Sequence, residues 1–428
     1  MVVVVTDYDI RTNVADGELS DPSRAWGQAT TLGFGQPAMS EASLEHWWRA
    51  QTGNHVRHRS AHPRPRPTGL PDGTPVATFA SFDTTINTGG GHLAPANLVT
   101  DVTVRTSHRR RGLLRRLMHA DMSEARERGS LMASLTASEG AIYGRFGYGI
   151  ASRRTRVELV TDSRFSLVED ARSHDQIEVV ANDAAPPLIR QVFDAVHAST
   201  RGSHGRLETY PEKLVGVWNY DEEEPDPSVR VAVAFAGDGT PTGHVSYRLP
   251  NENLSGANEA LEVLELLGTS PAAELELWNF VGSIDLVHKV RYGNLRPDSP
   301  LPWALGDPRL LTTERTSDFT WLRLLDVPGA LRARGFDRDG DATFATEDPL
   351  GLANGAWHVR VAGGEVSVEE TSEADVHIDF NALGPLYAGS VDGRVLASAG
   401  RLTGPADGVA ALSALFATRD LPYCVSGF

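Results

Sequence analysis

The sequence predicts a mixed α/β protein of the α+β class, and three observations support this fold class. Over residues 98–137 a strand, a basic turn, an amphipathic helix and a second strand follow one another. A hairpin, a strand and a helix come in sequence again over residues 229–282. Between residues 357 and 417 short strands alternate with helices, which is the pattern of a compact sheet with helices beside it.

The length of the chain predicts several domains, since 428 residues exceed what a single hydrophobic core normally holds. We expect three, over residues 1–155, 156–305 and 306–428. Hydrophobic residues make up 40% and charged residues 22% of the chain, as in soluble globular proteins.

Charge, apolar runs and cysteine content predict which partners and which cell compartment suit this chain. A formal net charge of −16 argues against a nucleic-acid partner and favours cationic ones. No apolar run approaches 18 residues, so no membrane span is predicted. The opening Met1 to Val5 is too short for a secretion signal and is interpreted as a first strand. The single cysteine, Cys424, excludes an intrachain disulfide and is typical of a cytoplasmic protein.

The first segment begins with predicted helices over residues 20–33 and 41–51 and a hairpin around residues 76–81. His55, His58 and His62 lie between them and raise the question of a metal site. However, the neighbouring arginines would repel a cation and the prolines prevent a helix. We therefore expect an exposed loop here and no metal.

The unit over residues 98–137 follows from its hydrophobic periodicity. In LVTDVTVR, Val102 and Val104 face one side and Asp101 faces the other, which predicts a strand. Apolar residues recur at helical spacing over residues 112–128 and predict an amphipathic helix. The apolar run over residues 131–137 predicts a second strand.

The turn between the first strand and the helix reads RRRGLL, residues 109–114. Such a turn directs backbone N–H groups and guanidinium groups to an anion at the helix N-terminus, where the helix dipole also favours negative charge. The alternative is an ordinary crossover with solvated arginines. The turn resembles the Arg/Gln-x-x-Gly-x-Gly/Ala signature of the GCN5-related (GNAT) acetyltransferases, which binds the coenzyme A pyrophosphate. Leu114 departs from its last position.

A narrower resemblance rests on three separated stretches. HRRRGLLR followed by ASEGAIYGRFGYG is similar to the Eis (enhanced intracellular survival) family of N-acetyltransferases. So are DFTWLRLLDVPGALRARGF at residues 318–336 and the aromatic last residue, Phe428. The resemblance implies tandem GNAT-like folds followed by a sterol-carrier-protein-like domain. It also implies use of acetyl-CoA and assembly into a homohexamer.

The second and third segments fit this organisation. A strand over residues 229–235, a hairpin, a strand over residues 261–267 and a helix from Ala272 echo the first segment. No Arg-rich Gly turn follows that strand, so we expect a GNAT-like fold without a coenzyme site. The third segment has predicted strands and helices over residues 357–361, 365–368, 376–380, 382–388 and 406–417.

Acetyl transfer to an amine requires an anchored coenzyme, a polarised carbonyl, a neutral amine and a protonated leaving thiolate. By the superfamily resemblance, edge amides of the first strand pair with the pantetheine arm, and Ser138 and Glu139 also line the site. The expected coenzyme contacts are Val102, Thr103, Val104, Arg110, Arg111, Gly112, Leu113, Leu114, Arg115, Ser138 and Glu139.

The proton donor and acceptor are predicted from two aromatic residues. A tyrosine stays protonated at neutral pH because its ordinary pKa is about 10. Tyr143 matches the general acid of Eis enzymes, whereas Tyr148 is expected to be a packed aromatic. The resemblance makes the terminal carboxylate of Phe428 the general base. The alternatives are a packed role for Tyr143 and a frayed tail.

The acceptor cleft is expected to combine carboxylates with aromatic walls, since cations gain from both. The family match places Phe34, Trp48 and Asp318 there. Gly427 stands where mycobacterial members carry Glu, which should weaken recognition of multiply charged aminoglycosides. Three acidic residues are candidates to compensate: Glu41, Glu45 and Asp307.

Three functions are compatible with these features. The first is acetyl-CoA-dependent N-acetylation of aminoglycoside-like or lysine-like small amines by direct attack. A narrower alternative is a protein lysine acetyltransferase acting on peptide amines. The third is a non-catalytic lipid-binding or carrier protein on a GNAT scaffold, although Gly-rich breaks such as Gly363-Gly364 disfavour a lipid tunnel.

Overall fold

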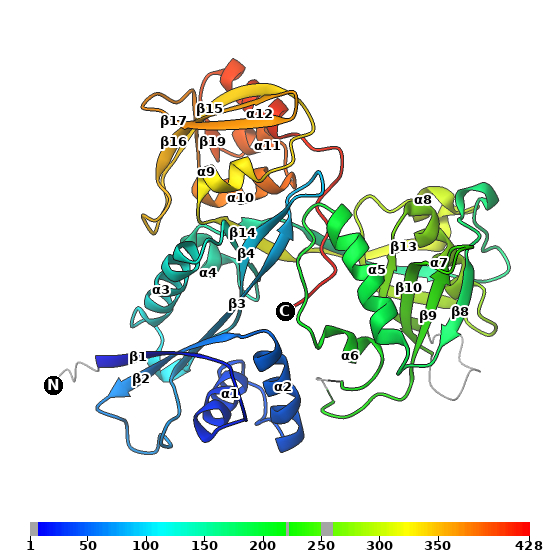
Figure 1. Ribbon diagram of the computed structural model, residues 1–428, viewed down its shortest axis with the longest axis horizontal. Helices are drawn as coiled ribbons and strands as arrows, with labels where there is room; N and C mark the ends of the chain where they lie inside the picture. Colours follow the sequence, from blue (N-terminus) through cyan, green and yellow to red (C-terminus); the bar gives the residue numbers. More distant parts are fainter. Residues whose placement is uncertain (1–6, 220–221, 250–259) are drawn as a thin grey trace.

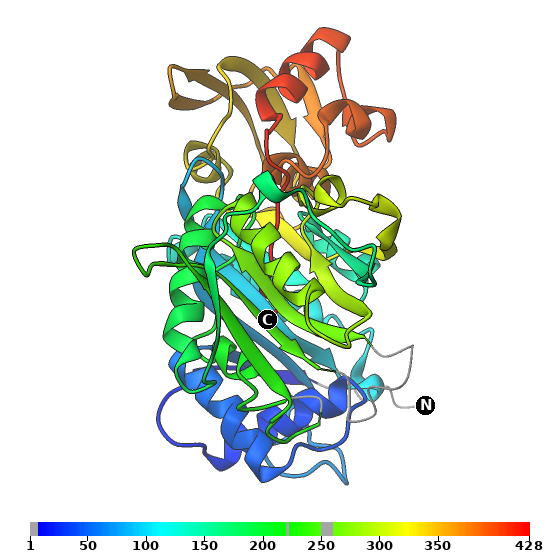
Figure 2. The same cartoon turned by 90° about the vertical axis from the view of Figure 1, so that its right-hand side faces the viewer.

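The computed structural model describes residues 7–219, 222–249 and 260–428. The described residues form three sheets, each packed against helices (Figures 1 and 2). In Figure 1 the first domain is blue and cyan, the second mainly green, and the third orange and red. The strand predicted over Met1 to Val5 lies outside the described residues. No helix in the described parts of the chain is long and apolar enough to cross a membrane.

A sheet with the order β1-β2-β3-β4-β5-β14-β6 builds the first domain. Its strands are β1 Asp7–Val14, β2 Arg57–Arg64, β3 Ala77–Asn87, β4 Leu93–Val104, β5 Met132–Thr136, β6 Gly149–Ile150 and β14 Thr320–Leu324. Its helices are α1 Asp21–Gly33, α2 Glu41–Gly53, α3 Leu113–Glu127 and α4 Gly140–Tyr143, with short 3-10 turns at Thr106–His108 and Gly144–Phe146. The three long predicted helices are confirmed to within two residues at each end.

The helices of this domain begin where the local sequence supplies a cap. Ser20 and Ser40 accept hydrogen bonds from the N–H groups of Ser23 and Ser43 and so cap α1 and α2. Helix α3 has no such side-chain cap, and its N-cap is Gly112 in the left-handed conformation. The start of α3 is therefore open to a ligand, whereas the other two are closed by their own serines.

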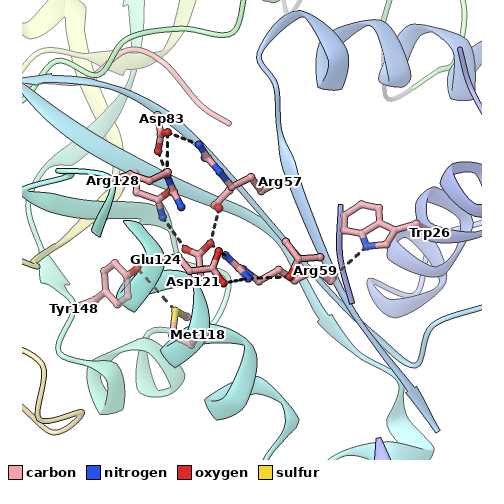
Figure 3. A network of polar contacts seen from close by, with 12 residues as sticks. Trp26, Arg57, Arg59, Asp83, Met118, Asp121, Glu124, Arg128 and Tyr148 are labelled. Carbon is pink, nitrogen blue, oxygen red and sulfur yellow. Dashed lines mark hydrogen bonds and ion pairs between the residues drawn. The ribbon is translucent and has the colours of Figure 1, made fainter. Parts of the chain in front are cut away.

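A buried polar network fixes α3 on the sheet (Figure 3). Asp121 of α3, which is fully buried, accepts hydrogen bonds from Arg59 of β2 (3.2 Å), Ser81 of β3 (2.6 Å) and Asn97 of β4 (2.7 Å). Glu124, one turn later, accepts from Arg59 at 2.7 Å. Removing one partner of a buried ion pair leaves the other charge unpaired, which is costly. The network therefore fixes the C-terminal half of α3 on strands β2, β3 and β4.

The exposed loop predicted around the three histidines is confirmed only at His55, which lies exposed in a turn. It is wrong for His58 and His62, because residues 57–64 form strand β2. The ladder with β3 ends at Ala61, so Pro63 pairs only with β1, where a proline is tolerated. His58 is 4% exposed and stacks on Trp26 at a centroid distance of 4.1 Å. Burial lowers the pKa of His58 to about 4, so this histidine is a neutral core residue.

The second domain contains a sheet with the order β13-β7-β12-β11-β10-β9-β8. Its strands are β7 Arg153–Val160, β8 Gln176–Val180, β9 Val229–Phe235, β10 Pro241–Arg248, β11 Leu261–Gly268, β12 Lys289–Leu295 and β13 Leu311–Asp318. Its helices are α5 Ala185–Ser199, α6 Tyr210–Leu214, α7 Pro271–Gly282 and α8 Leu301–Ala304, with 3-10 turns at Glu169–Ala171 and Pro308–Leu310. The core under α7 is apolar and centres on Leu277 and Trp278.

The third domain is a smaller sheet with the order β17-β16-β15-β18-β19. Its elements are α9 Val327–Arg332, β15 Gly340–Thr346, β16 Gly355–Ala362, β17 Glu365–Glu370, β18 Val376–Ile378, α10 Phe380–Ala388, α11 Gly393–Ser398, β19 Leu402–Thr403 and α12 Ala406–Phe416. Aromatic rings fill its interior: Phe344 contacts both Trp357 and Phe416.

The structure differs from the predicted boundary at residues 305 and 306. Strand β13 lies in the second sheet and β14 lies in the first, between β5 and β6. Residues 311–324 therefore complete the two preceding domains, and the third begins with α9. A long-range strand exchange of this kind leaves no local mark in the sequence.

The last residues form an ordered tail. From the third domain the chain runs back between the first two, where it ends (Figures 1 and 2). The N–H of Tyr423 donates to the Arg201 carbonyl at 2.9 Å, and Arg206 donates to the Ser426 hydroxyl at 2.9 Å. Residues 422–426 are all buried, so the tail is not frayed.

Candidate active site

Strands β4 and β5 separate in the middle of the first sheet. They pair in parallel from Ala96 and Met132 to Val99 and Leu135. Beyond Val99, β4 continues to Val104 while β5 ends at Thr136. This separation exposes one edge of β4 and creates a wedge-shaped opening in the sheet.

A bulge in β4 lies at the opening. Thr78 pairs with Thr103 and Ala80 with Thr100, so Phe79 alone faces both Asp101 and Val102. Asp101 has a φ of 51°, an uncommon conformation for a residue other than glycine. The extra residue alters the alternation of side chains along the strand exactly where the wedge begins to open.

The basic turn closes one end of the wedge. Arg110 and Gly112 both have positive φ, 62° and 75°. The first helical hydrogen bond runs from the Arg116 N–H to the Gly112 carbonyl at 3.1 Å. The N–H groups of Leu113, Leu114 and Arg115 precede that ladder and lack helical partners. A side chain built on Gly112 would meet no atom within 4 Å, and the three residues after it line an open cleft.

The first cleft has a volume of about 390 Å³ and lies between the β4 edge, the turn and α4. Of the expected coenzyme residues, all but Arg111 line it. The Arg111 guanidinium instead donates to the Tyr8 hydroxyl at 3.0 Å and to the Ser107 carbonyl at 3.3 Å. Arg109 of the predicted basic turn also lines it. Further lining residues that the sequence did not point to are Gly33, His108, Ile142, Arg145 and Phe146.

A second cleft of about 460 Å³ adjoins the first. It contains residues of β4, β5, β7, β13 and the tail. Four residues line both clefts: Phe34, Val102, Ser138 and Tyr143. The two clefts therefore meet at these four residues, with the open edge of β4 common to both.

Tyr143 lies at this junction, at the end of α4. Its side chain is 7% exposed, and burial, helped by the charge of Glu139, raises the pKa of Tyr143 to about 12. No side chain within the described parts of the chain hydrogen-bonds its hydroxyl group. Tyr148, 6.2 Å away between ring centroids, is fully buried with its hydroxyl on the Met118 sulfur at 3.9 Å. As expected, Tyr148 is packed into the core.

Phe428 lies in the second cleft and is held by its ring and its main chain. The ring contacts Phe82 and His204 at centroid distances of 6.0 and 5.8 Å. The Thr136 hydroxyl donates to a main-chain oxygen of Phe428 at 3.4 Å. Burial lowers the pKa of His204 to about 3, so this neighbour is neutral and does not pair with the carboxylate.

The expected acceptor residues are only partly brought together. Phe34 and Asp318 line the second cleft, and Asp318 accepts a hydrogen bond from the Trp321 indole at 2.6 Å. The structure does not place Trp48 there, since its indole is 7% exposed and donates to the Gly17 carbonyl at 2.9 Å. The family match pointed to Trp48, whereas the adjacent Trp47 is the tryptophan that interacts with Asp101.

Gly427 lines the second cleft, but none of the three residues considered as substitutes for a carboxylate there does so. Glu41 pairs with Arg24, Asp307 lies near Arg164, and Glu45 is exposed on α2. These groups are engaged or lie elsewhere on the surface.

Asp101 supplies a second side-chain carboxylate in this cleft besides Asp318, and sequence reasoning missed it. Burial raises the pKa of Asp101 to about 6, although the Trp47 indole acts in the opposite direction. The only sequence signal was an acidic residue inside an otherwise apolar strand just before the basic turn.

This arrangement is suited to group transfer between two bound molecules. The first cleft offers amides and guanidinium groups to an anionic ligand such as a diphosphate. The second offers carboxylates and aromatic rings to a cationic one. A neutral phenol, able to donate a proton, lies where the two ligands would meet.

Comparisons with known proteins agree with this geometry. Models described as acetyltransferase (GNAT) domains match residues 55–151 and 212–324, and a sterol carrier protein domain matches residues 327–425. The chain is 32% identical over 434 residues to an uncharacterized N-acetyltransferase of Streptomyces avermitilis, covering 99% of each chain. It is 30% identical over 338 residues to the N-acetyltransferase Eis of Mycobacterium tuberculosis, covering 78% of this chain and 81% of that one.

Solved structures share the whole architecture. Eis1 from Mycobacterium abscessus matches with a TM-score of 0.80 and 25% identity, covering 99% of this chain and 100% of that one. A GCN5-related N-acetyltransferase from Anabaena variabilis shares the fold at 17% identity, with a TM-score of 0.79 over 98% of this chain and all of that one. The predicted family, fold class and enzyme class are thus confirmed, and the chain belongs to the Eis-like family of GNAT N-acetyltransferases.

Proposed function

We propose that the protein transfers an acetyl group from acetyl-CoA to a primary amine of an aminoglycoside-like or lysine-like acceptor by direct attack. Tyr143 acts as the general acid and the terminal carboxylate of Phe428 as a general base. The observation that carries this proposal is the meeting of the two clefts at Tyr143. A coenzyme in one and an acceptor in the other would place thioester, amine and phenol together.

The first cleft fits a coenzyme A molecule. The unbonded amides of Leu113 to Arg115 and the side chains of Arg109 and Arg110 would hold its diphosphate. The open edge of β4, from Val102 to Val104, would pair with its amide-containing arm. Acetyl-CoA, when bound, supplies the thioester from which the acetyl group is transferred.

Tyr143 suits the role of acid because it is neutral and its hydroxyl is not engaged by another side chain. Its raised pKa keeps the proton on the oxygen throughout the physiological range. A charge developing on sulfur next to this phenol would draw the proton across. Tyr148 has the same chemistry but is sealed in the core.

The acceptor cleft suits a cationic amine. Aromatic rings of Phe34, Phe319 and Phe428 line it together with the carboxylate of Asp318. The terminal carboxylate adds a further negative charge, although its ordinary pKa of roughly 3.5 makes it a weak base. By the family resemblance Gly427 stands where mycobacterial members carry Glu, so we propose a preference for acceptors with fewer positive charges.

A direct test is an acetyltransferase assay with acetyl-CoA, a thiol reagent for the released coenzyme, and a panel of acceptors. The panel contains kanamycin, cadaverine and Nα-acetyl-lysine amide. We expect turnover with at least one of them. Tyr143→Phe should lower kcat by about 100-fold or more with an unchanged Kd for acetyl-CoA. Tyr148→Phe is the matched control and should keep most of the activity.

The role of the tail is tested by extending the chain past Phe428 with Gly-Ser-Gly, which replaces the carboxylate by an amide. The extended protein should bind acetyl-CoA normally but turn over slowly. Full activity of the extended protein would refute Phe428 as the base, and full activity of Tyr143→Phe would refute the acid.

Peptide amines are the narrower alternative, and mass spectrometry of acetylated peptides beside small amines separates the two acceptor classes. The family resemblance extends the proposal to a cytoplasmic homohexamer, which sedimentation velocity of the purified protein would test.

A further inference from the structure

Asp101 has several features that distinguish it from an ordinary strand residue. It occupies the β4 bulge with a φ of 51°. Its main-chain carbonyl accepts a hydrogen bond from the Thr78 hydroxyl at 2.9 Å, which fixes the backbone. Its side chain lines the acceptor cleft, and the group that interacts with it is the neutral Trp47 indole. The fold thus holds a carboxylate on the wall of the acceptor cleft, and no ion pair joins it to a cation among the residues that the structure describes.

Acetylation of a primary ammonium group requires two proton acceptors or one acceptor used twice. A primary ammonium group loses one proton before it can attack. After the C–N bond forms and the C–S bond breaks, its nitrogen loses another. The leaving sulfur takes a single proton, from Tyr143. Two protons therefore leave the nitrogen in each turnover, and the Phe428 carboxylate alone is a weak acceptor for an ammonium proton with a pKa near 10.

We infer that Asp101 binds the acceptor's ammonium group and takes its first proton, which makes it a second catalytic carboxylate of this site. This inference rests on the proposed function. Once Asp101 has taken this proton, the lone pair of the amine nitrogen attacks the thioester carbonyl. The second proton of the nitrogen then passes to the Phe428 carboxylate. Tyr143 gives its proton to sulfur and regains one from solvent, and solvent also takes the protons held by the two carboxylates.

The other charged or titratable groups of the cleft do not serve as well. Arg154, from β7, is a cation and accepts no proton. One oxygen of Asp318, from β13, is already engaged by the Trp321 indole. Tyr143, from α4, must stay protonated as the acid. A base works best when its pKa is close to the working pH, and burial brings Asp101 nearest to that condition.

The decisive experiment compares Asp101→Asn with the wild type over pH 5 to 10, using cadaverine as the acceptor. For the wild type, kcat/KM should rise through an ionisation near pH 6. In Asp101→Asn that limb should vanish. The kcat/KM at pH 7.5 should fall about 100-fold or more and recover about tenfold per pH unit as free amine accumulates in solution. The exposed turn residue Asp238 supplies the control Asp238→Asn, which should match the wild type.

A second acceptor separates a proton acceptor from a structural residue. Trifluoroethylamine is already neutral at pH 7.5 and has no first proton to lose. Asp101→Asn should acetylate it within about threefold of the wild-type rate. An equally large loss with both acceptors would overturn the inference, as would an unchanged pH profile with cadaverine.

Coenzyme binding distinguishes the two proposals. Asp101→Asn should bind acetyl-CoA with wild-type Kd by calorimetry. If the wild type binds no acetyl-CoA and acetylates no amine, the proposed function fails and the inference with it. If both proteins bind it and turn over cadaverine alike, only the role of Asp101 is refuted.

Discussion

The first two domains contain the same opened sheet, but they use it differently. In each, a strand after a hairpin pairs in parallel with the strand that follows a helix, and the pairing stops early. In the first domain β4 and β5 part after Val99. In the second, β11 and β12 part after Val263. Both leading strands carry a register shift against the preceding hairpin strand. The wedge is therefore a property of the repeated fold, and a few residues determine what occupies it in each domain.

The helix that starts beside each wedge shows the first difference. Helix α3 starts at Gly112 with no side-chain cap, so its first amides are open. Helix α7 has Ser270 as its N-cap, and the Ser270 hydroxyl accepts from the Ala273 N–H at 3.2 Å. Its first residue, Pro271, has no N–H to offer a ligand. The second helix start therefore has fewer donors for a phosphate, and no Arg-rich Gly turn precedes it in the sequence.

The second difference is what fills the wedge. The tail enters the second one, where the Asn294 amide donates to the Cys424 carbonyl at 3.0 Å and the Tyr423 hydroxyl donates to the Asn294 carbonyl at 2.9 Å. These hydrogen bonds hold the tail so that Phe428 lies in the cleft beside Tyr143. One copy of the fold thus binds the coenzyme in our proposal, while the other positions the end of the chain for the first.

The largest expected effect comes from releasing the tail. Tyr423 is 4% exposed, so Tyr423→Ala should lower the free energy of unfolding by about 3–5 kcal/mol. It should also lower kcat much more than the affinity for acetyl-CoA, because the first wedge is untouched. Urea denaturation and the thiol assay measure the two effects. Leu421→Ala is the control, since Leu421 is 45% exposed. Wild-type kcat in folded Tyr423→Ala would separate the tail from catalysis.

The next prediction is a gain in the free energy of unfolding, from a substitution of Asp101. In the folded protein the pKa of Asp101 is about 6, above its ordinary value of 3.8. Below about pH 4 both folded and unfolded chains are protonated there and no cost arises. Between about pH 4 and 6 the unfolded chain ionises first, so stability falls, and above pH 6 the full cost persists. Asp101→Asn should therefore raise the free energy of unfolding at pH 7 by about 1–3 kcal/mol.

The same substitution should leave stability at pH 4 nearly unchanged, which thermal denaturation at both pH values can show. A variant that is more stable at pH 7 and yet slower is what an ionised functional carboxylate requires. Loss of stability at pH 7 would instead make Asp101 a structural residue.

Opposite ends of α3 allow a sharper test of its open start. Gly112→Ala and Gly129→Ala both place a side chain at positive φ, 75° and 92°, with nothing within 4 Å. Each should cost about 1–2 kcal/mol of stability. Only Gly112→Ala should weaken acetyl-CoA binding, by about tenfold, because only that residue shapes the basic turn. Equal Kd values for the two variants would argue that the turn does not hold the coenzyme.

The smallest effect concerns the second helix start. Ser270→Ala removes a cap and should cost about 1 kcal/mol without changing acetyl-CoA affinity or kcat. A change in acetyl-CoA affinity would mean that the second wedge also contacts the coenzyme.

The features predicted correctly from the sequence are local ones. The turn around Gly112, the helix after it and the position of Tyr143 each depend on a short stretch of chain with a recognisable spacing. The first cleft follows from these together with the separation of β4 from β5. Arg111 was the exception, because its side chain turns to Tyr8, a residue about a hundred positions away in the chain.

The errors all involve contacts between distant segments. Asp101 was missed as a residue of the second cleft, because the bulge that holds it there depends on how β4 pairs with Phe79. The strand at His58 is stabilised by partners in β1 and β3 and by Trp26. The exchange of β13 and β14 between domains likewise depends on the assembled sheets. Hydrophobic periodicity carries no information about such partners.

In our proposal one wedge of the repeated fold binds acetyl-CoA, and the other is filled by the chain's own tail. Titration calorimetry of acetyl-CoA into the purified protein tests this claim most directly. We expect a stoichiometry of one coenzyme per chain. The affinity for acetyl-CoA should be lower in Gly112→Ala and unchanged in Ser270→Ala. No binding, or two equivalents per chain, would contradict it.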